Sequence, residues 1–125
     1  VPVGYLRILT LDFEVISEGG FLLGTASFVC MPQAFSAVEY AKHLFAFTAH
    51  ESCGKCFPCR LGATRGKEML ESALEKDQKF SEELINDLLE TMEVGSLCAL
   101  GGGLPLAIKN LLEHCADEFE PLMEK

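Results

Sequence analysis

Three cysteines follow one another at a fixed spacing in the run from Glu51 to Arg60, which reads ESCGKCFPCR. The spacing, Cys-x2-Cys-x2-Cys, places three sulfurs on one short loop, and a short loop of thiolates favours a metal site over an ordinary piece of core. A further cysteine lies in the run GSLCALG, between two helical patterns, where the chain can fold back to complete a set of four thiolates. Three clustered cysteines plus one distant cysteine are typical of a cubane iron–sulfur centre. The sequence therefore predicts a metal centre at Cys53, Cys56, Cys59 and Cys98.

Zinc is the main alternative occupant, because structural zinc sites also take four thiolates in a tetrahedron. Zinc sites usually present cysteines as two separated pairs, whereas consecutive Cys-x2 steps are typical of iron–sulfur proteins. A zinc site would make the chain a structural or interaction module of a multisubunit complex. A labile cluster that senses redox state would use the same four cysteines. Iron versus zinc content separates the first two hypotheses.

The same residues carry a resemblance to a known family. The run ESCGKCFPCR, followed by SLCALG, resembles the iron–sulfur domain of the NADH-binding flavoprotein subunit of respiratory complex I. The diaphorase subunits of NAD(P)-reducing hydrogenases and of NAD-dependent formate dehydrogenases contain the same module. The resemblance covers roughly residues 11 to 118. It implies that the domain binds one [4Fe-4S] cluster, with the four cysteines of the predicted centre as its ligands.

The resemblance also implies partners and cofactors beyond this chain. Electrons would pass from a flavin to further iron–sulfur centres, so the implied partners are the flavin- and NADH-binding part and the iron–sulfur subunits of a redox complex. FMN and NAD(P)H are expected on a missing region or on a partner, because no glycine-rich phosphate loop here follows a strand into a helix. We therefore expect part of an NAD(P)H-dependent oxidoreductase that is not catalytic alone, and the assignment as an enzyme stays open.

Composition limits the other functions. The chain has 125 residues and a formal net charge of −9, so it is of single-domain size and acidic. An acidic chain does not favour nucleic acid or an anionic membrane surface as a partner. No apolar run reaches the length of about 18 residues that a membrane helix needs, and no secretory signal is present, which predicts a cytoplasmic protein or a place on the cytoplasmic face of a complex. The chain begins at Val1 rather than Met, which suggests a fragment or a processed product.

The first part of the chain, residues 1–33, differs from the rest. Apolar residues alternate imperfectly from Val1 to Val15, which predicts one or two short strands, and the run from Phe21 to Cys30 predicts a short buried strand or extended segment. By resemblance, this segment is the end of a small ubiquitin-like domain.

Residues 34–125 have helical periodicity throughout, so the expected fold class is mainly α, a four-helix bundle with a short β-containing N-terminal segment. The first helix is expected over residues 35–49 with Ser36 as its N-cap, and the second over residues 61–75. A third is expected from the cap Ser81 to Gly95, with Leu84, Ile85, Leu88, Leu89 and Met92 inward. A fourth is expected from Leu104, with Pro105 in its first turn. In an antiparallel bundle, both cysteine segments then lie at one end.

Several neighbours of the cysteines are assigned supporting roles. Backbone N–H groups of Gly101–Gly103 are expected to donate to cluster sulfurs, and Lys55 and Arg60 to raise the reduction potential through their charge. An apolar group, Phe57, Leu97 and Leu100, is expected to exclude water. The remaining cysteines, Cys30 and Cys115, are interpreted as small buried apolar residues. His50 is interpreted as a cation at a helix end.

Overall fold

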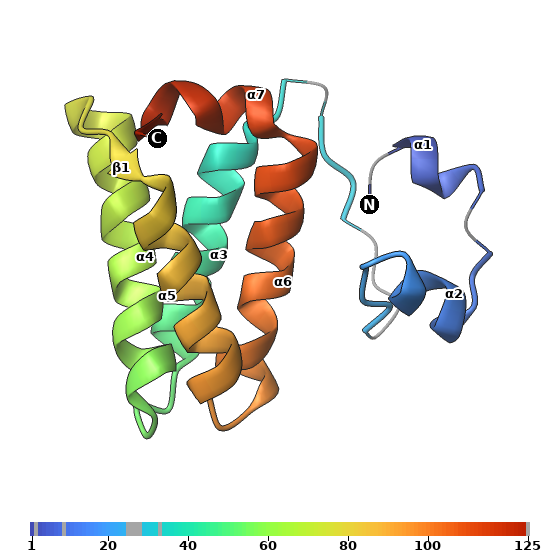
Figure 1. The fold of residues 1–125 in the computed structure, drawn as a ribbon, viewed down its shortest axis with the longest axis horizontal. Helices are drawn as coiled ribbons and strands as arrows, with labels where there is room; N and C mark the ends of the chain where they lie inside the picture. Colours follow the sequence, from blue (N-terminus) through green and yellow to red (C-terminus); the bar gives the residue numbers. More distant parts are fainter. Residues whose placement is uncertain (2, 9, 25–28, 33, 125) are drawn as a thin grey trace. The chain divides into compact units, whose positions relative to one another are not determined.

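The computed structural model describes residues 1, 3–8, 10–24, 29–32 and 34–124. They fall into two compact units, Val1–Phe35 and Ser36–Lys125, each of which is described by itself (Figure 1). The assignment of residues 1–33 to the end of a ubiquitin-like domain stays a prediction.

The prediction of strands near the N-terminus is wrong for the described residues of this unit, which form helices α1 (Val3–Leu6) and α2 (Phe13–Glu18). The side chain of Asp12 accepts hydrogen bonds from the N–H groups of Glu14, at 2.9 Å, and Val15, at 3.3 Å, and so caps the start of α2. These local bonds win over the imperfect alternation, since a strand has no partner here and Leu11 and Phe13 are exposed.

The segment after α2 is not a strand in its described part either. Gly20 has a φ of 79° and ends the helix, and Phe21 turns back to bury its ring beside Tyr5, with the ring centroids 5.3 Å apart. Residues 25–28, where the predicted strand would continue, lie outside the described residues.

The second unit is a four-helix bundle, so the predicted fold class, mainly α, is confirmed. Figure 1 shows the four long helices side by side and alternating in direction. They are α3 (Ala37–Glu51), α4 (Phe57–Lys76), α5 (Glu82–Gly95) and α6 (Ala99–His114). Fully buried side chains from all four helices form the core, among them Phe45, Leu70, Leu89 and Ile108.

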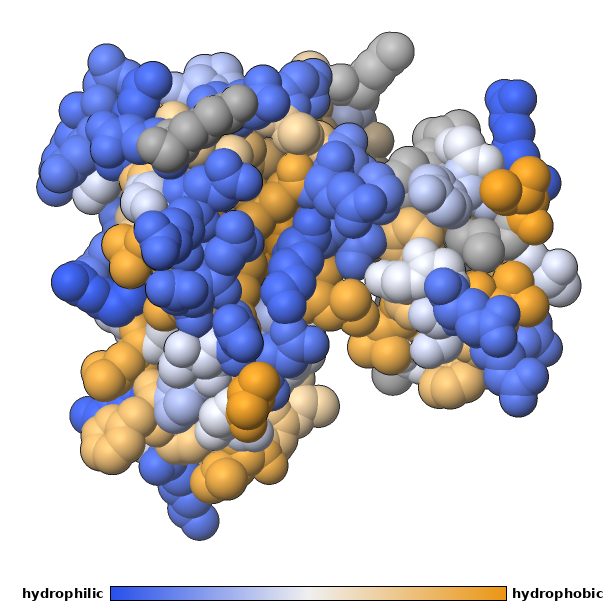
Figure 2. Space-filling model, in the orientation of Figure 1, coloured by the Kyte–Doolittle hydropathy of each residue, from blue (hydrophilic) through white to orange (hydrophobic). Residues whose placement is uncertain are grey.

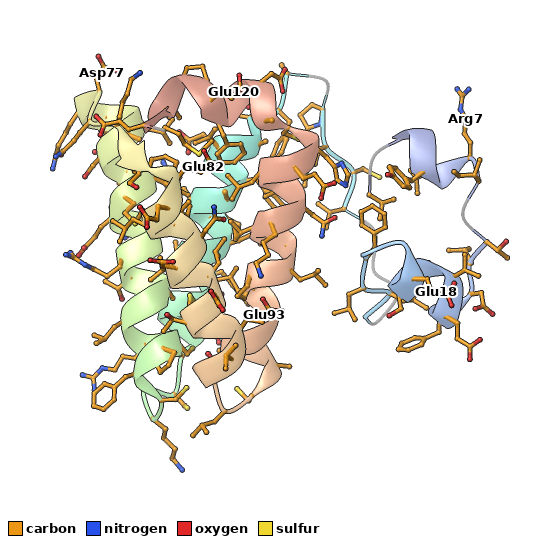
Figure 3. The ribbon with its side chains drawn as sticks, in the orientation of Figure 1. Arg7, Glu18, Asp77, Glu82, Glu93 and Glu120 are labelled. Atoms are coloured by element: carbon orange, nitrogen blue, oxygen red, sulfur yellow. The ribbon has the colours of Figure 1, made fainter. Side chains whose placement is uncertain are left out.

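Local capping sets the ends of these helices. Ser36 and Ser81 each accept a hydrogen bond of 3.3 Å from the N–H three residues on, as predicted, so α3 and α5 begin where the sequence places them. At the other end of α4, Asp77 is left-handed with a φ of 52° and its N–H bonds back into the helix, at the end of the bundle away from the cysteines (Figure 3).

Two glycines of α4 let the helices approach closely. A Cβ at Gly66 would lie 2.2 Å from the ring of Phe45, and a Cβ at Gly62 would lie 2.6 Å from Met92. The absence of a side chain at these positions therefore permits α3 and α5 to pack against the backbone of α4.

Two helices begin earlier than predicted. Helix α4 begins at Phe57, because Pro58 fits the first turn of a helix, so Cys59 is already helical. Helix α6 begins at Ala99, so the glycines are helical and Pro105 lies inside the helix. The inward stripe predicted for α5 is right for Ile85, Leu89 and Met92, whereas Leu84 is exposed and Leu88 is partly buried.

The end of the bundle away from the cysteine loops is held by the C-terminal segment. After α6 come α7 (Ala116–Phe119), the 3-10 helix η1 (Glu120–Leu122) and strand β2 (Met123–Glu124). Strand β2 pairs in parallel with β1 (Phe80–Ser81), with Phe80 opposite Met123. None of the helices in the described part of the chain combines the length and apolar character that crossing a bilayer requires.

Candidate metal centre

The two cysteine segments lie at the same end of the bundle. One connects α3 to α4 and the other connects α5 to α6, and both loops close the same end (Figure 1). The two segments are in contact, because a Cβ at Gly95 would lie 2.7 Å from the ring of Pro58. The bundle therefore brings together residues that are far apart in the sequence.

Cys56 and Cys98 occupy equivalent places. Each is the N-cap of a long helix, α4 and α6 respectively, and neither side chain caps the helix through a hydrogen bond. The positive end of a helix dipole stabilises a negative charge and favours a thiolate over a thiol. Both sulfurs therefore start from an environment that suits metal ligation.

A backbone bond connects the two loops directly. A hydrogen bond from the backbone N–H of Leu97 is the largest cause that lowers the pKa of the Cys56 thiol, and the N–H of Cys59 lowers it further. Leu97 is the residue before Cys98, so the first cysteine loop lies within hydrogen-bonding reach of the second. The lowered pKa favours the thiolate form that a metal requires.

Cys59 is the inner cysteine of the group. It is buried, with 3% of its surface exposed, and it lies in the first turn of α4. Its thiol donates to the hydroxyl of Ser52 over 3.4 Å. On the other side it meets α6, where a Cβ at Gly101 would lie 2.5 Å from the Cys59 Cβ and 2.9 Å from its sulfur. Only glycine fits at position 101.

Cys53 and Cys98 are exposed at the surface of the same end. Gly54 follows Cys53 with a φ of 75°, and its N–H donates to the Ser52 hydroxyl over 3.2 Å, which folds the loop into a tight turn. Within the described residues, no three His, Cys, Asp or Glu side chains converge closely enough to hold a metal ion together.

Two serines belong to this site that the sequence alone does not single out. Ser52 bonds to both Cys59 and Gly54. The hydroxyl of Ser96 is buried at the junction of α5 and α6 and has no hydrogen-bond partner among the described residues. Both serines lie within two residues of a cysteine, but burial and the missing partner are non-local facts that no sequence pattern reveals.

The predicted iron–sulfur cluster fits the residues present. The donor set is four cysteines, two of them at helix N-termini and one in contact with the facing helix, which is the chemistry of a cysteine-ligated cluster. The buried hydroxyl of Ser96 supplies a polar group for which the described residues provide no partner.

Apolar side chains surround the cysteine loops on the outside. Figure 2 shows apolar surface gathered at this end of the bundle. Phe57 is 72% exposed and Leu97 is 80% exposed, so the prediction that they exclude water from the site is wrong for this chain by itself. The reason is that Phe57 is the first residue of α4 and points outward. Three further exposed residues lie on the ends of the helices that close this end, Phe47, Leu61 and Val94.

The other singled-out residues have structural places. Lys55 and Arg60 are exposed beside the cysteines. His50, in the last turn of α3, lies 2.9 Å from the carboxylate of Glu51 through its Nδ1 atom.

The two remaining cysteines differ from each other. Cys115 is partly buried against the core, and burial raises the pKa of its thiol. Cys30 is exposed, so its interpretation as a buried apolar residue is wrong.

Comparison with known proteins gives a consistent set of relatives. The family described as the NADH-ubiquinone oxidoreductase-F iron–sulfur binding region matches residues 39–122. One component of the NADH-quinone oxidoreductase of Rhizobium meliloti (strain 1021) is 32% identical over 126 residues, covering 100% of this chain and 28% of the relative. The mitochondrial 51 kDa subunit of the NADH-ubiquinone oxidoreductase of Neurospora crassa is 32% identical over 117 residues, covering 92% and 24%.

A hydrogenase subunit and a hydrogenase structure are similar as well. The NADP-reducing hydrogenase subunit HndC of Solidesulfovibrio fructosivorans is 30% identical over 113 residues, covering 90% of this chain and 23% of the relative. A chain in the crystal structure of an NAD+-reducing [NiFe]-hydrogenase in the H2-reduced state superimposes with a TM-score of 0.65 and 26% identity, over 75% of this chain and 16% of that one. The chain spans about a quarter of the length of the curated relatives that it matches.

Proposed function

Because the chain belongs to the family of the NADH-ubiquinone oxidoreductase-F iron–sulfur binding region, we propose that it relays single electrons through one bound [4Fe-4S] cluster. The ligands in this proposal are the four thiolates of Cys53, Cys56, Cys59 and Cys98. The observation that carries the assignment is the contact between the two cysteine loops, where the Leu97 N–H faces the Cys56 sulfur and Gly101 packs on Cys59.

When bound, such a cluster supplies a one-electron couple whose potential depends on the hydrogen bonds and charges around its sulfurs. The chain's own residues set that environment. The dipoles of α4 and α6 and the cations Lys55 and Arg60 all favour added negative charge at this end of the bundle. The bundle itself contributes rigidity, since Cys59 is fixed between Ser52 and Gly101.

The exposed apolar rim of the site supports a role in an assembly. An electron carrier must bring its centre close to a donor and an acceptor, and Phe57 and Leu97 expose apolar surface next to the cysteines. In this proposal the electron donor is a flavin, on another part of the protein or on a partner chain, and the acceptor is a further iron–sulfur centre of a multisubunit oxidoreductase. The oxidation of NADH takes place outside residues 1–125.

Metal and sulfide analysis tests this function. The chain is purified anaerobically, iron, zinc and acid-labile sulfide are measured on one sample, and EPR spectra are recorded after reduction with dithionite. We expect about four iron and about four sulfide per chain and a signal from a reduced S = 1/2 centre. One zinc without sulfide or signal would contradict the proposal and favour a structural zinc module instead.

A further inference from the structure

The hydroxyl of Ser96 is in an unusual position. Ser96 ends α5, and its backbone N–H is fixed by a 3.2 Å hydrogen bond to the carbonyl of Met92. Its side-chain oxygen is buried and finds no hydrogen-bond partner in the described part of the chain. Buried hydroxyls in folded proteins are nearly always paired, so this group needs a partner that the described residues do not supply.

The surroundings of this hydroxyl indicate which partner it takes. A Cβ placed on Gly101 would lie 2.6 Å from the Ser96 oxygen and 2.9 Å from the Cys59 sulfur, so both atoms are within 3 Å of the same point. Ser96 also lies two residues before Cys98. The hydroxyl is therefore placed between an inner cysteine and an outer cysteine of the proposed cluster site.

We propose that the Ser96 hydroxyl donates a hydrogen bond to a sulfur of the bound cluster, either the Cys59 thiolate or a bridging sulfide, and thereby raises its reduction potential. This inference rests on the function proposed above. A hydrogen bond to sulfur stabilises the more negative, reduced form more than the oxidised form, and such bonds are a main way in which proteins tune these potentials. One electron enters the centre, and the serine keeps its proton throughout.

Ser52 provides an internal comparison. Its hydroxyl also approaches Cys59, at 3.4 Å, but it already accepts the Gly54 N–H over 3.2 Å and so has a structural role in the turn. Ser96 makes no such bond within the described residues. Replacement of Ser96 therefore removes a donor to sulfur without removing a bond within the protein fold. Ser96 is a positioning and tuning residue, not a ligand.

The experiment is a redox titration monitored by EPR on the loaded protein, for wild type, Ser96→Ala, Ser96→Thr and the control Ser72→Ala. Ser72 lies on α4 near the end of the bundle away from the cysteines. We expect Ser96→Ala to keep wild-type iron and sulfide and to shift the midpoint potential to more negative values. Ser96→Thr, which keeps the hydroxyl, and Ser72→Ala should both retain the wild-type potential.

A second measurement reads the hydrogen bond directly. After exchange into D2O, the reduced wild-type centre should show a coupled exchangeable deuteron by pulsed EPR, and Ser96→Ala should lose that coupling. Full loading of Ser96→Ala with an unchanged potential and an unchanged coupling would overturn the inference.

Two other results are also decisive. If Ser96→Ala fails to load, a Ser96→Thr protein with the wild-type potential supports the inference, and the absence of any exchangeable coupling in wild type overturns it. A wild-type chain without iron and sulfide would instead overturn the proposed function itself.

Discussion

The carboxylate of Glu118 accepts a hydrogen bond of 2.8 Å from the backbone N–H of Ala37, although 81 positions separate the two residues in the sequence. Ala37 is the first residue of α3, and Glu118 lies in α7. A carboxylate at the start of a helix satisfies an unpaired N–H group and interacts favourably with the helix dipole. The C-terminal segment thus caps the helix that leads to the cysteine loop.

Removal of this contact should destabilise the bundle. We expect Glu118→Ala to lower the free energy of unfolding by about 1–2 kcal/mol, since a helix-capping hydrogen bond of this kind is lost. The midpoint of anaerobic thermal unfolding measures the effect. Glu118→Gln keeps an acceptor oxygen and should lose less, so an equal loss in both variants would contradict the capping role.

The contact between α3 and α4 depends on Gly66. An alanine there would place its Cβ 2.2 Å from the fully buried ring of Phe45, which has no room to move. We expect Gly66→Ala to destabilise the bundle by about 1–3 kcal/mol, because the cost of overpacking exceeds the better helix propensity of alanine. Thermal unfolding followed by circular dichroism measures the change.

Gly103→Ala is the matched control for this substitution. Gly103 is also helical, but a Cβ there meets no heavy atom within 4 Å. This variant should be more stable than wild type by up to about 1 kcal/mol. If both variants destabilise the bundle equally, the contact with Phe45 does not explain the loss at Gly66.

A third glycine tests the site itself. At Gly101 a Cβ would lie 2.5 Å from the Cβ of Cys59 and 2.6 Å from the Ser96 hydroxyl, so Gly101→Ala must displace Cys59. We expect the iron content of Gly101→Ala to fall well below that of wild type while Gly103→Ala stays fully loaded. Iron and sulfide analysis of the two variants checks this, and full loading of Gly101→Ala would show that Cys59 needs no fixed position.

The assignment of ligands predicts a sharp division among the six cysteines. Cys56→Ala and Cys98→Ala should lose the iron and the EPR signal, because each removes one of four thiolates. Cys30→Ala and Cys115→Ala should retain both. A Cys56→Ala protein with full iron and an unchanged spectrum would contradict the ligand set.

Cys115 should react slowly with alkylating reagents. Burial raises the pKa of its thiol, and the nearby carboxylates of Glu118 and Asp117 raise it further, so less thiolate is present at a given pH. Pulse labelling with iodoacetamide, followed by mass spectrometry, should show a slower rate at Cys115 than at exposed Cys30, rising as the pH increases. Equal rates across the pH range would contradict this.

The same raised pKa has a consequence for stability. The folded chain holds the Cys115 proton more tightly than the unfolded chain, so this contribution is full below the unfolded pKa and is lost as the pH rises through the folded pKa.

The parts of the fold that depend on local chemistry could be predicted from the sequence. The caps at Ser36 and Ser81 act over three residues, and the inward positions of Ile85, Leu89 and Met92 follow from helical spacing alone. Capping by Glu118 could not be predicted, because it joins two segments that only the folded bundle brings together.

The errors near the site have a common cause. Glycine has a low helix propensity and proline is expected in a first turn, so the sequence predicts the start of α6 at Leu104. Tertiary packing overrides both preferences, since Gly101 must lie in the helix to meet Cys59. The identity of the four cysteines could be proposed from spacing, whereas the buried hydroxyl of Ser96 is visible only in three dimensions.

The two cysteine loops meet in space but are separated along the chain by α4 and α5. During synthesis, a nascent chain emerges from its N-terminal side, so three thiolates leave the ribosome on one open loop well before the fourth. With the proposed ligands, the last donor arrives only when α5 has been made and can pack on α4. Cofactor loading then follows bundle closure in time, and the machinery that delivers iron and sulfide meets a chain that is already nearly folded.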